Sequence, residues 1–296
     1  MATGLTIAFA FVLTVCGLTS CSSADEDAQT DNVRKLRKLS IVNAPLTRVT
    51  LSDNGTTLGA FWNEGDVATY INMSMLESAS LRYGNLTASE DGNPTMLTGN
   101  VYCMAGDLLA VIYPHVTPAT GDGTFTISLG GQKGTLADIE DNYHYVYGLG
   151  EVTSVTNNEA IGTISDMKPL LAVCKFTFKD EEGNSITVRK LEIGYYDSYS
   201  GTSIGYPQSG TVTPADDPTD IEVVPSDPVT PLTIKLATAT ADGVYVALLP
   251  GGEKTEYVDS RLEFTFTVND IYTGTAKAVL NAGRFYPVTL KMTQSN

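Results

Sequence analysis

The sequence has few of the residues from which catalytic and metal sites are usually built. Its two histidines, His115 and His144, do not stand at spacings typical of metal ligands. It contains neither a Gly-x-Ser-x-Gly nucleophile motif nor a phosphate-binding glycine loop. We therefore predict that the protein is not an enzyme and holds no metal or cofactor. Glycoside hydrolysis stays open, because its paired carboxylates meet only in three dimensions.

Positive charge and cysteine are also scarce. The 296 residues include 18 Lys and Arg against 34 Asp and Glu, a formal net charge of −16. Such a surface repels phosphate backbones, which argues against a nucleic-acid partner. Of four cysteines, only Cys103 and Cys174 lie beyond the first 21 residues. We expect them to be buried as small apolar side chains, although a disulfide is allowed outside the cytoplasm.

No long segment shows the 3.6-residue period of a helix. The chain instead repeats short alternating segments between turn signals, a pattern that predicts an all-β protein. The clearest is 262–268, with Leu262, Phe264, Phe266 and Val268 on one face. The segments 125–129 and 172–178 alternate in the same way. Because alternation restarts after a turn-rich stretch at 155–168, we predict two β-sandwich domains in series, at residues 39–165 and 166–296.

The chain begins with an apolar run that is too short to span a bilayer. It extends from Leu5 to Leu18 and has the length of a signal-peptide core. It ends in Leu18-Thr19-Ser20-Cys21, which resembles the lipobox of bacterial lipoproteins. The resemblance implies a signal peptide over residues 1–20, cleavage between Ser20 and Cys21, and acyl chains such as palmitate on Cys21. These chains would hold the protein at the outer membrane. The absence of Lys and Arg from residues 1–20 departs from the usual pattern.

Residues 21–38 read as a polar tether. The acidic cluster at 25–27 either resembles the surface-export signal of lipoproteins from Bacteroides-type bacteria or is simply a solvated linker. The basic cluster at 34–38 could be read by a trypsin-like protease or by an anionic head group.

Trp62-x-x-Gly65-Asp66 stands directly before an alternating segment. Its residues predict a turn that enters a strand, in which Gly65 takes a positive φ, Asp66 accepts from nearby amides and Trp62 caps a core. Stacking of Trp62 on a carbohydrate is the alternative.

These pieces together resemble the fimbrillin-like pilus proteins of Bacteroides and relatives. The resemblance covers essentially the whole chain. It is carried by the lipobox, Thr47-Arg48, the Trp-x-x-Gly-Asp turn, and the late segments 246–250 and 282–286, in that order. It implies that both β-sandwich domains are transthyretin-like. It also implies a structural or adhesive subunit of a cell-surface fimbrium.

The family resemblance also implies an assembly mechanism. A trypsin-like protease cuts such a lipoprotein after an arginine in its first strand, and a strand from another pilus subunit fills the exposed groove. This is β-strand addition. Carried onto this chain, the cut falls between Arg48 and Val49, with Arg34 and Arg37 as competing sites. The partners would be other pilus subunits and a ligand on a host or bacterial surface.

Two questions stay open at this point. The alternative function is an uncleaved surface lipoprotein that binds glycan or host protein through loops such as 195–231, which is rich in proline. The acidic turn at 180–184 could hold calcium, but it lacks the spacing of a calcium loop, and a solvated hairpin tip is favoured. Because Tyr286 to Met292 reads as a strand that its own sandwich needs, we expect an accessory or tip subunit.

The lipobox yields the first prediction. Replacing Cys21 with alanine removes the thiol that would be acylated, so Cys21→Ala should accumulate as an unlipidated precursor. Metabolic labelling with a palmitate analogue and membrane fractionation check this. A labelled Cys21→Ala protein in the outer membrane would contradict it.

Overall fold

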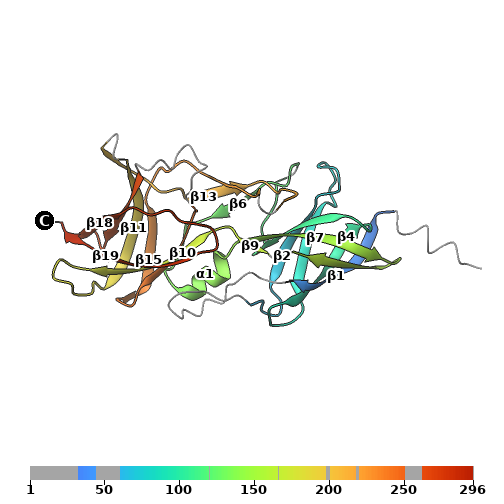
Figure 1. The fold of residues 1–296 in the computed structure, drawn as a ribbon, viewed down its shortest axis with the longest axis horizontal. Helices are drawn as coiled ribbons and strands as arrows, with labels where there is room; N and C mark the ends of the chain where they lie inside the picture. Colours follow the sequence, from blue (N-terminus) through green and yellow to red (C-terminus); the bar gives the residue numbers. More distant parts are fainter. Residues whose placement is uncertain are drawn as a thin grey trace, which may run out of the picture.

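The computed structural model describes residues 33–44, 61–119, 121–165, 167–197, 201–217, 220–250 and 262–295. These residues form strands in four sheets and one short helix, α1 (Leu136–Asn142), so the protein is mostly β, and the predicted all-β fold holds apart from this helix. The molecule is elongated, with β1, β4 and β7 in one half and β11, β18 and β19 in the other (Figure 1). None of the described residues belongs to a helix long and apolar enough to cross a membrane.

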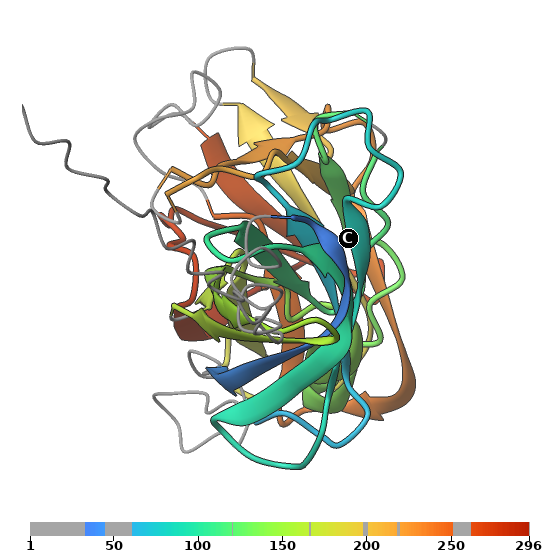
Figure 2. The same ribbon diagram turned by 90° about the vertical axis from the view of Figure 1, so that its right-hand side faces the viewer.

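The first half of the chain forms one sheet that closes on itself. The strand order is β5-β2-β3-β4-β1-β8-β7-β9, and β5 also pairs with β7. Hydrogen bonds therefore run round a ring from β5 to β7, and Figure 2 looks toward this end of the molecule. The strands are β1 (Lys35–Ala44), β2 (Val67–Asn72), β3 (Tyr83–Ala88), β4 (Thr95–Cys103), β5 (Leu108–Tyr113), β7 (Val146–Val155), β8 (Glu159–Ile164) and β9 (Lys168–Pro169).

The turn before β2 has the predicted form. Gly65 has a φ of +90°, and the amide of Asn63 donates to Asp66 Oδ2 over 2.8 Å. Trp62 is fully buried, and its ring meets that of Tyr113 edge-on at 4.9 Å. Its indole Nε1 donates to the carbonyl of Ala44, the last residue of β1, over 3.2 Å. The carbohydrate-stacking interpretation of Trp62 is therefore wrong, because no face of the ring reaches solvent.

The second half of the chain contains two further sheets with aromatic rings packed between them. One has the order β16-β10-β19; in the other, β11 lies between β17 on one side and β12 and β15 on the other, and β18 and β20 follow β17. Phe176 meets Phe266 with ring centroids 5.0 Å apart. Phe264 and Val268 are also buried, as the alternation of 262–268 predicts. The strands are β10 (Ala172–Lys179), β11 (Val188–Asp197), β12 (Thr202–Ile204), β15 (Leu232–Thr240), β16 (Val244–Leu248), β17 (Leu262–Val268), β18 (Tyr272–Ala276), β19 (Phe285–Lys291) and β20 (Thr293–Gln294).

A small fourth sheet joins segments from both halves of the sequence. Its order is β14-β13-β6, with β6 (Phe125–Ser128), β13 (Ser209–Val212) and β14 (Val223–Pro225). The stretch 195–231, which we expected to lack regular structure over much of its length, thus contributes β12, β13 and β14. The expected boundary stretch 155–168 likewise contains β8. The domain boundary between residues 165 and 166 stays a prediction. Across it, β6 of the first predicted domain pairs with β13 of the second.

The candidate chemical groups of the sequence are held as structural residues. Cys103 and Cys174 are both buried and free, so the described structure contains no disulfide between them. Within the described ranges, no three His, Cys, Asp or Glu residues gather where a metal could bind. In the acidic turn, Asp180 Oδ1 accepts from the amide of Asn184 over 2.7 Å, which is the geometry of a closed hairpin tip.

His144 is buried beside the Tyr113 ring. Its ring lies 6.5 Å from that of Tyr113, and its Nε2 has no hydrogen-bond partner among the described residues. Burial lowers the pKa of His144 from 6.5 to about 3, because the charged ring would lose its hydration. The ring is therefore neutral in the folded protein at neutral pH.

This histidine makes stability depend on pH. Between pH 6.5 and about 3 the unfolded chain binds a proton that the folded chain does not, so stability falls as pH falls through this window. At roughly 1.4 kcal/mol per pH unit, His144 should remove about 2 kcal/mol of unfolding free energy between pH 7.5 and 5. Urea unfolding of the wild type and of His144→Leu at both pH values checks this. Between pH 7.5 and 5, the unfolding free energy of His144→Leu should fall by about 2 kcal/mol less than that of the wild type. Equal losses in both proteins would contradict it.

Candidate functional site: the first strand and its arginines

Strand β1 alternates cleanly between an inward and an outward face. Arg37, Leu39 and Ile41 point inward and are 1%, 0% and 0% exposed. The outward face carries Leu36 and Val42, which are 62% and 43% exposed. The spacing of two residues between inward positions is that of a strand, and it places an arginine in line with two aliphatic core residues.

β1 has a hydrogen-bonded neighbour on each side. It runs antiparallel to β4, with Leu39 opposite Gly99, and parallel to β8, with Leu39 opposite Ala160. The other side of β4 is also closely packed, since a Cβ at Gly99 would clash with the carbonyl oxygen of Asn85 in β3. Taking β1 away would leave unpaired edges on both β4 and β8, with an apolar slot between them.

The residue before β1 is fixed by a buried carboxylate. Asp107 is 1% exposed, and its two oxygens accept from Arg34: Oδ1 from Nη2 over 2.7 Å and Oδ2 from Nε over 2.9 Å. This pair of bonds is the strong, oriented form of an arginine–carboxylate contact. The bond from Asp107 raises the pKa of the Arg34 guanidinium, which stays charged.

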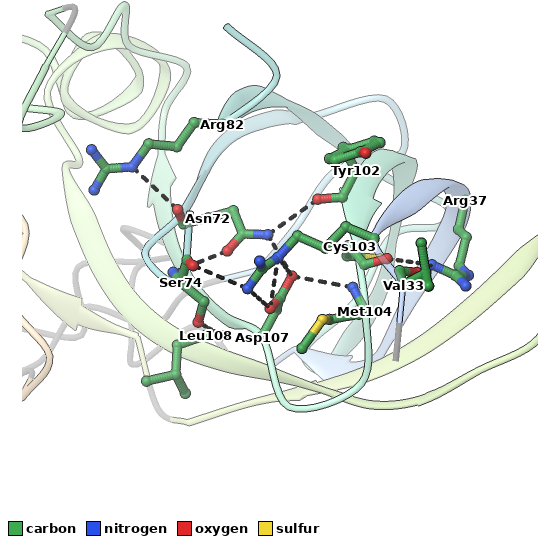
Figure 3. Close-up of polar contacts among 11 residues, drawn as sticks. Val33, Arg37, Asn72, Ser74, Arg82, Tyr102, Cys103, Met104, Asp107 and Leu108 are labelled. Atoms are coloured by element: carbon green, nitrogen blue, oxygen red, sulfur yellow. Dashed lines mark hydrogen bonds and ion pairs between the residues drawn. The ribbon is translucent and has the colours of Figure 1, made fainter. Parts of the chain in front are cut away.

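Asp107 is in turn held by groups outside β1. Its Oδ2 accepts from Asn72 Nδ2 over 2.9 Å and from the amide of Met104 over 3.1 Å (Figure 3). Asn72 Nδ2 also donates to the carbonyl of Tyr102, and its Oδ1 accepts from the amide of Ser74. The carboxylate is thus positioned by β2 and by the turn between β4 and β5.

Arg37 places a second guanidinium in the interior. Its Nε donates to the carbonyl of Thr156 over 2.7 Å, and its Nη1 donates to the carbonyls of Cys103 and Val33. Thr156 lies in the turn between β7 and β8, and Cys103 ends β4. Burial raises the pKa of the Cys103 thiol to about 11, so it stays protonated beside this arginine.

The structure brings together some of the predicted site residues. Arg34 and Arg37, the competing cleavage sites, are both bound within the first sheet. Leu39 and Ile41 are buried, whereas Val42 is partly exposed. The remaining predicted site residues lie outside the described residues, namely Ser20, Cys21, Arg48 and Val49.

Sequence reasoning missed Asp107 and Asn72. Asp107 follows Met104-Ala105-Gly106, and an aspartate in a turn before an apolar run is usually solvated, so no local signal marks it as buried. The inward position of Arg37 did leave a signal, because it shares the period-two register of Leu39 and Ile41.

The fold is similar to those of solved proteins from Bacteroides. A candidate cell adhesion protein from Bacteroides ovatus aligns with 89% of this chain and 97% of its own, at 14% identity and a TM-score of 0.51. A candidate cell adhesion protein from Bacteroides uniformis aligns with 88% of this chain and 93% of its own, at 14% identity and a TM-score of 0.49. A fimbrial protein from Bacteroides ovatus aligns with 88% and 51%, at 12% identity and 0.38. No family model and no curated protein matches. The first match shows a shared fold and nothing finer.

The Arg34–Asp107 contact should be important for stability. Asp107→Asn keeps the shape of the side chain but removes the charge that holds Arg34, so the free energy of unfolding should fall by about 2–3 kcal/mol. Asp270→Asn is the matched control, because Asp270 pairs with Lys190 at 2.6 Å on the surface and is 65% exposed. The free energy of unfolding should change little in Asp270→Asn. Chemical denaturation in which the two variants lose equally would contradict the prediction.

Proposed function

We propose that the protein is a structural or adhesive subunit of a cell-surface pilus, in an accessory or tip position. In this proposal it is anchored in the outer membrane through Cys21 until a trypsin-like protease cuts after Arg48. The cut frees β1, and a strand from another subunit takes its place. The partners are therefore other pilus subunits, and any adhesion ligand lies on a host or bacterial surface.

The observation that carries this proposal is the position of β1. It is the first described strand of the chain, yet it lies between β4 and β8 rather than at an edge. Its inward residues belong to the core, and its hydrogen bonds are mainly to backbone groups that any strand could satisfy. A strand in this position can be exchanged without changing the rest of the sheet, which is the requirement of β-strand addition.

The contacts of Arg34 and Arg37 favour Arg48 as the cleavage site. A protease needs an extended segment that it can pull into its own site. Arg37 is buried, its backbone pairs with Val101 of β4 and its side chain bonds Thr156, so cleavage there requires β1 to leave first. A cut after Arg34 would release only the tether and leave β1 in the sheet. Cleavage after Arg48 would free the whole strand.

The shared fold supports the choice of function class. The Bacteroides ovatus protein that aligns over nearly the whole of this chain is described as a candidate cell adhesion protein. The last described strands are already used by their own sheets, since β19 pairs with β10 and β20 with β18. Neither strand is available for donation without disrupting its own sheet, which fits a subunit that accepts a strand.

The N-terminal residue of the mature protein tests this proposal. Protein purified from the surface of a Bacteroides-type host should begin at Val49. Arg48→Gln should lower the cut fraction at least about tenfold, because trypsin-like enzymes read a guanidinium or ammonium at this position. The control Lys38→Gln changes an outward-facing basic residue of β1 and should still be cut at Val49.

A different N-terminus would overturn the proposal. Mature protein that begins at an acylated Cys21 and retains β1 would favour the alternative, an uncleaved surface lipoprotein that binds glycan or host protein through its loops. Cutting of Arg48→Gln at the wild-type level would exclude Arg48 as the site.

A further inference from the structure

We infer that the slot filled by β1 selects its strand by two arginines three residues apart, followed by aliphatic residues at alternate positions, in the pattern Arg-x-x-Arg-x-aliphatic-x-aliphatic. The inference rests on the proposed function, since it names the kind of strand that can replace β1. In the chain itself these four positions are Arg34, Arg37, Leu39 and Ile41.

The first arginine has a receptor that does not depend on β1. Asp107 is 1% exposed, and its carboxylate is oriented by Asn72 Nδ2 and by the amide of Met104. Once Arg34 leaves with β1, this carboxylate keeps two neutral donors and loses the guanidinium that lies 2.7 Å away. A carboxylate buried to this extent is strongly stabilised by a guanidinium, so a strand that supplies one is favoured.

The second arginine has a receptor made of backbone carbonyls. The oxygens of Thr156 and Cys103 accept from Arg37 and belong to the β7–β8 turn and to β4, which both stay when β1 departs. Figure 3 shows the bond to Cys103. An aliphatic side chain at this position would fill the space but donate nothing to these oxygens. The Cys103 carbonyl is buried, and a buried acceptor that loses its donor is costly, so this position favours arginine although its neighbours on the same face are aliphatic.

The spacing between the four positions follows from strand geometry. Arg37, Leu39 and Ile41 are separated by two residues each and share the inward face. Arg34 lies directly before the strand and reaches Asp107 from there. Its spacing of three residues from Arg37 is therefore set by the position of Asp107 at the start of β1. A strand shifted by one residue would point its aliphatic residues at solvent.

Local contacts can be separated from overall charge within β1. Residues 34–38 hold four of the 18 Lys and Arg residues, so the acceptor without β1 is even more acidic and would attract any basic strand. The contacts of Lys35 and Lys38, however, are not buried: Lys35 Nζ donates to Asn157 Oδ1 over 3.0 Å in an exposed contact, and Lys38 is exposed. Each arginine is thus followed by a lysine of equal charge, and this lysine has no buried receptor among the described residues.

The test measures which strands the slot accepts. A recognition site for a specific protease is introduced into the full chain directly after Arg48. Cutting this site nicks the chain while β1 stays bound non-covalently. Fluorescent peptides copying residues 33–46 are then exchanged for the resident β1, and the bound fraction is measured by anisotropy after gel filtration. The variant peptides are Arg34→Ala and Arg37→Leu, with Lys35→Ala and Lys38→Leu as controls that each remove one positive charge.

We expect the unchanged peptide to bind, the two arginine variants to bind at least about tenfold more weakly, and the two lysine variants to stay within about threefold. Equal losses in all four variants would show attraction by overall charge alone and would overturn the inference. So would an Arg37→Leu peptide that binds as well as the unchanged one, or failure of every peptide to exchange.

The full-chain variants give a second measurement that needs no exchange. Arg37→Leu should lower the urea midpoint, whereas Lys38→Leu should not, and the reverse order would contradict the receptor at Thr156 and Cys103. Failure of the proposed function has a different signature, namely mature protein from cells that retains residues 33–44. That result would leave the ranking of peptides unchanged.

Discussion

The structure of the first half of this chain depends on a closed ring of hydrogen-bonded strands. Each strand of the ring has a hydrogen-bonded neighbour on both sides, and among the described strands of this sheet only β9 pairs on one side. β1 occupies the position between β4 and β8, where its loss would create two edges at once. The same arrangement that protects the folded subunit therefore makes the slot of β1 a strong acceptor when it is empty.

Two guanidinium contacts make this otherwise generic strand pairing specific. Backbone hydrogen bonds and aliphatic side chains would accept many strands, because they read only the period of two. Asp107 and the carbonyls of Thr156 and Cys103 require particular groups at particular positions. In this way specificity comes from polar groups that are costly to leave unpaired, while affinity comes from the strand as a whole.

The sequence predicted the elements better than their partners. Alternation in 125–129, 172–178 and 262–268 gave strands with the expected buried faces, because burial on one face imposes a period of two. It could not show that β6 pairs with β13, since pairing between distant segments leaves no local pattern. Within the site, the sequence drew attention to Arg34 and Arg37 as part of a basic cluster. It gave no sign of Asp107 and Asn72, because their burial results from contacts across the sheet.

The central claim is that β1 must leave its place for the subunit to assemble. Lys38 and Asn100 face each other across β1 and β4 at exposed positions, so Lys38→Cys with Asn100→Cys can staple the strand in place. The account predicts that the oxidised, stapled subunit is absent from pili on cells, that reduction restores it, and that the single variant Lys38→Cys behaves as wild type. Stapled subunits that enter pili as readily as reduced ones would contradict the account.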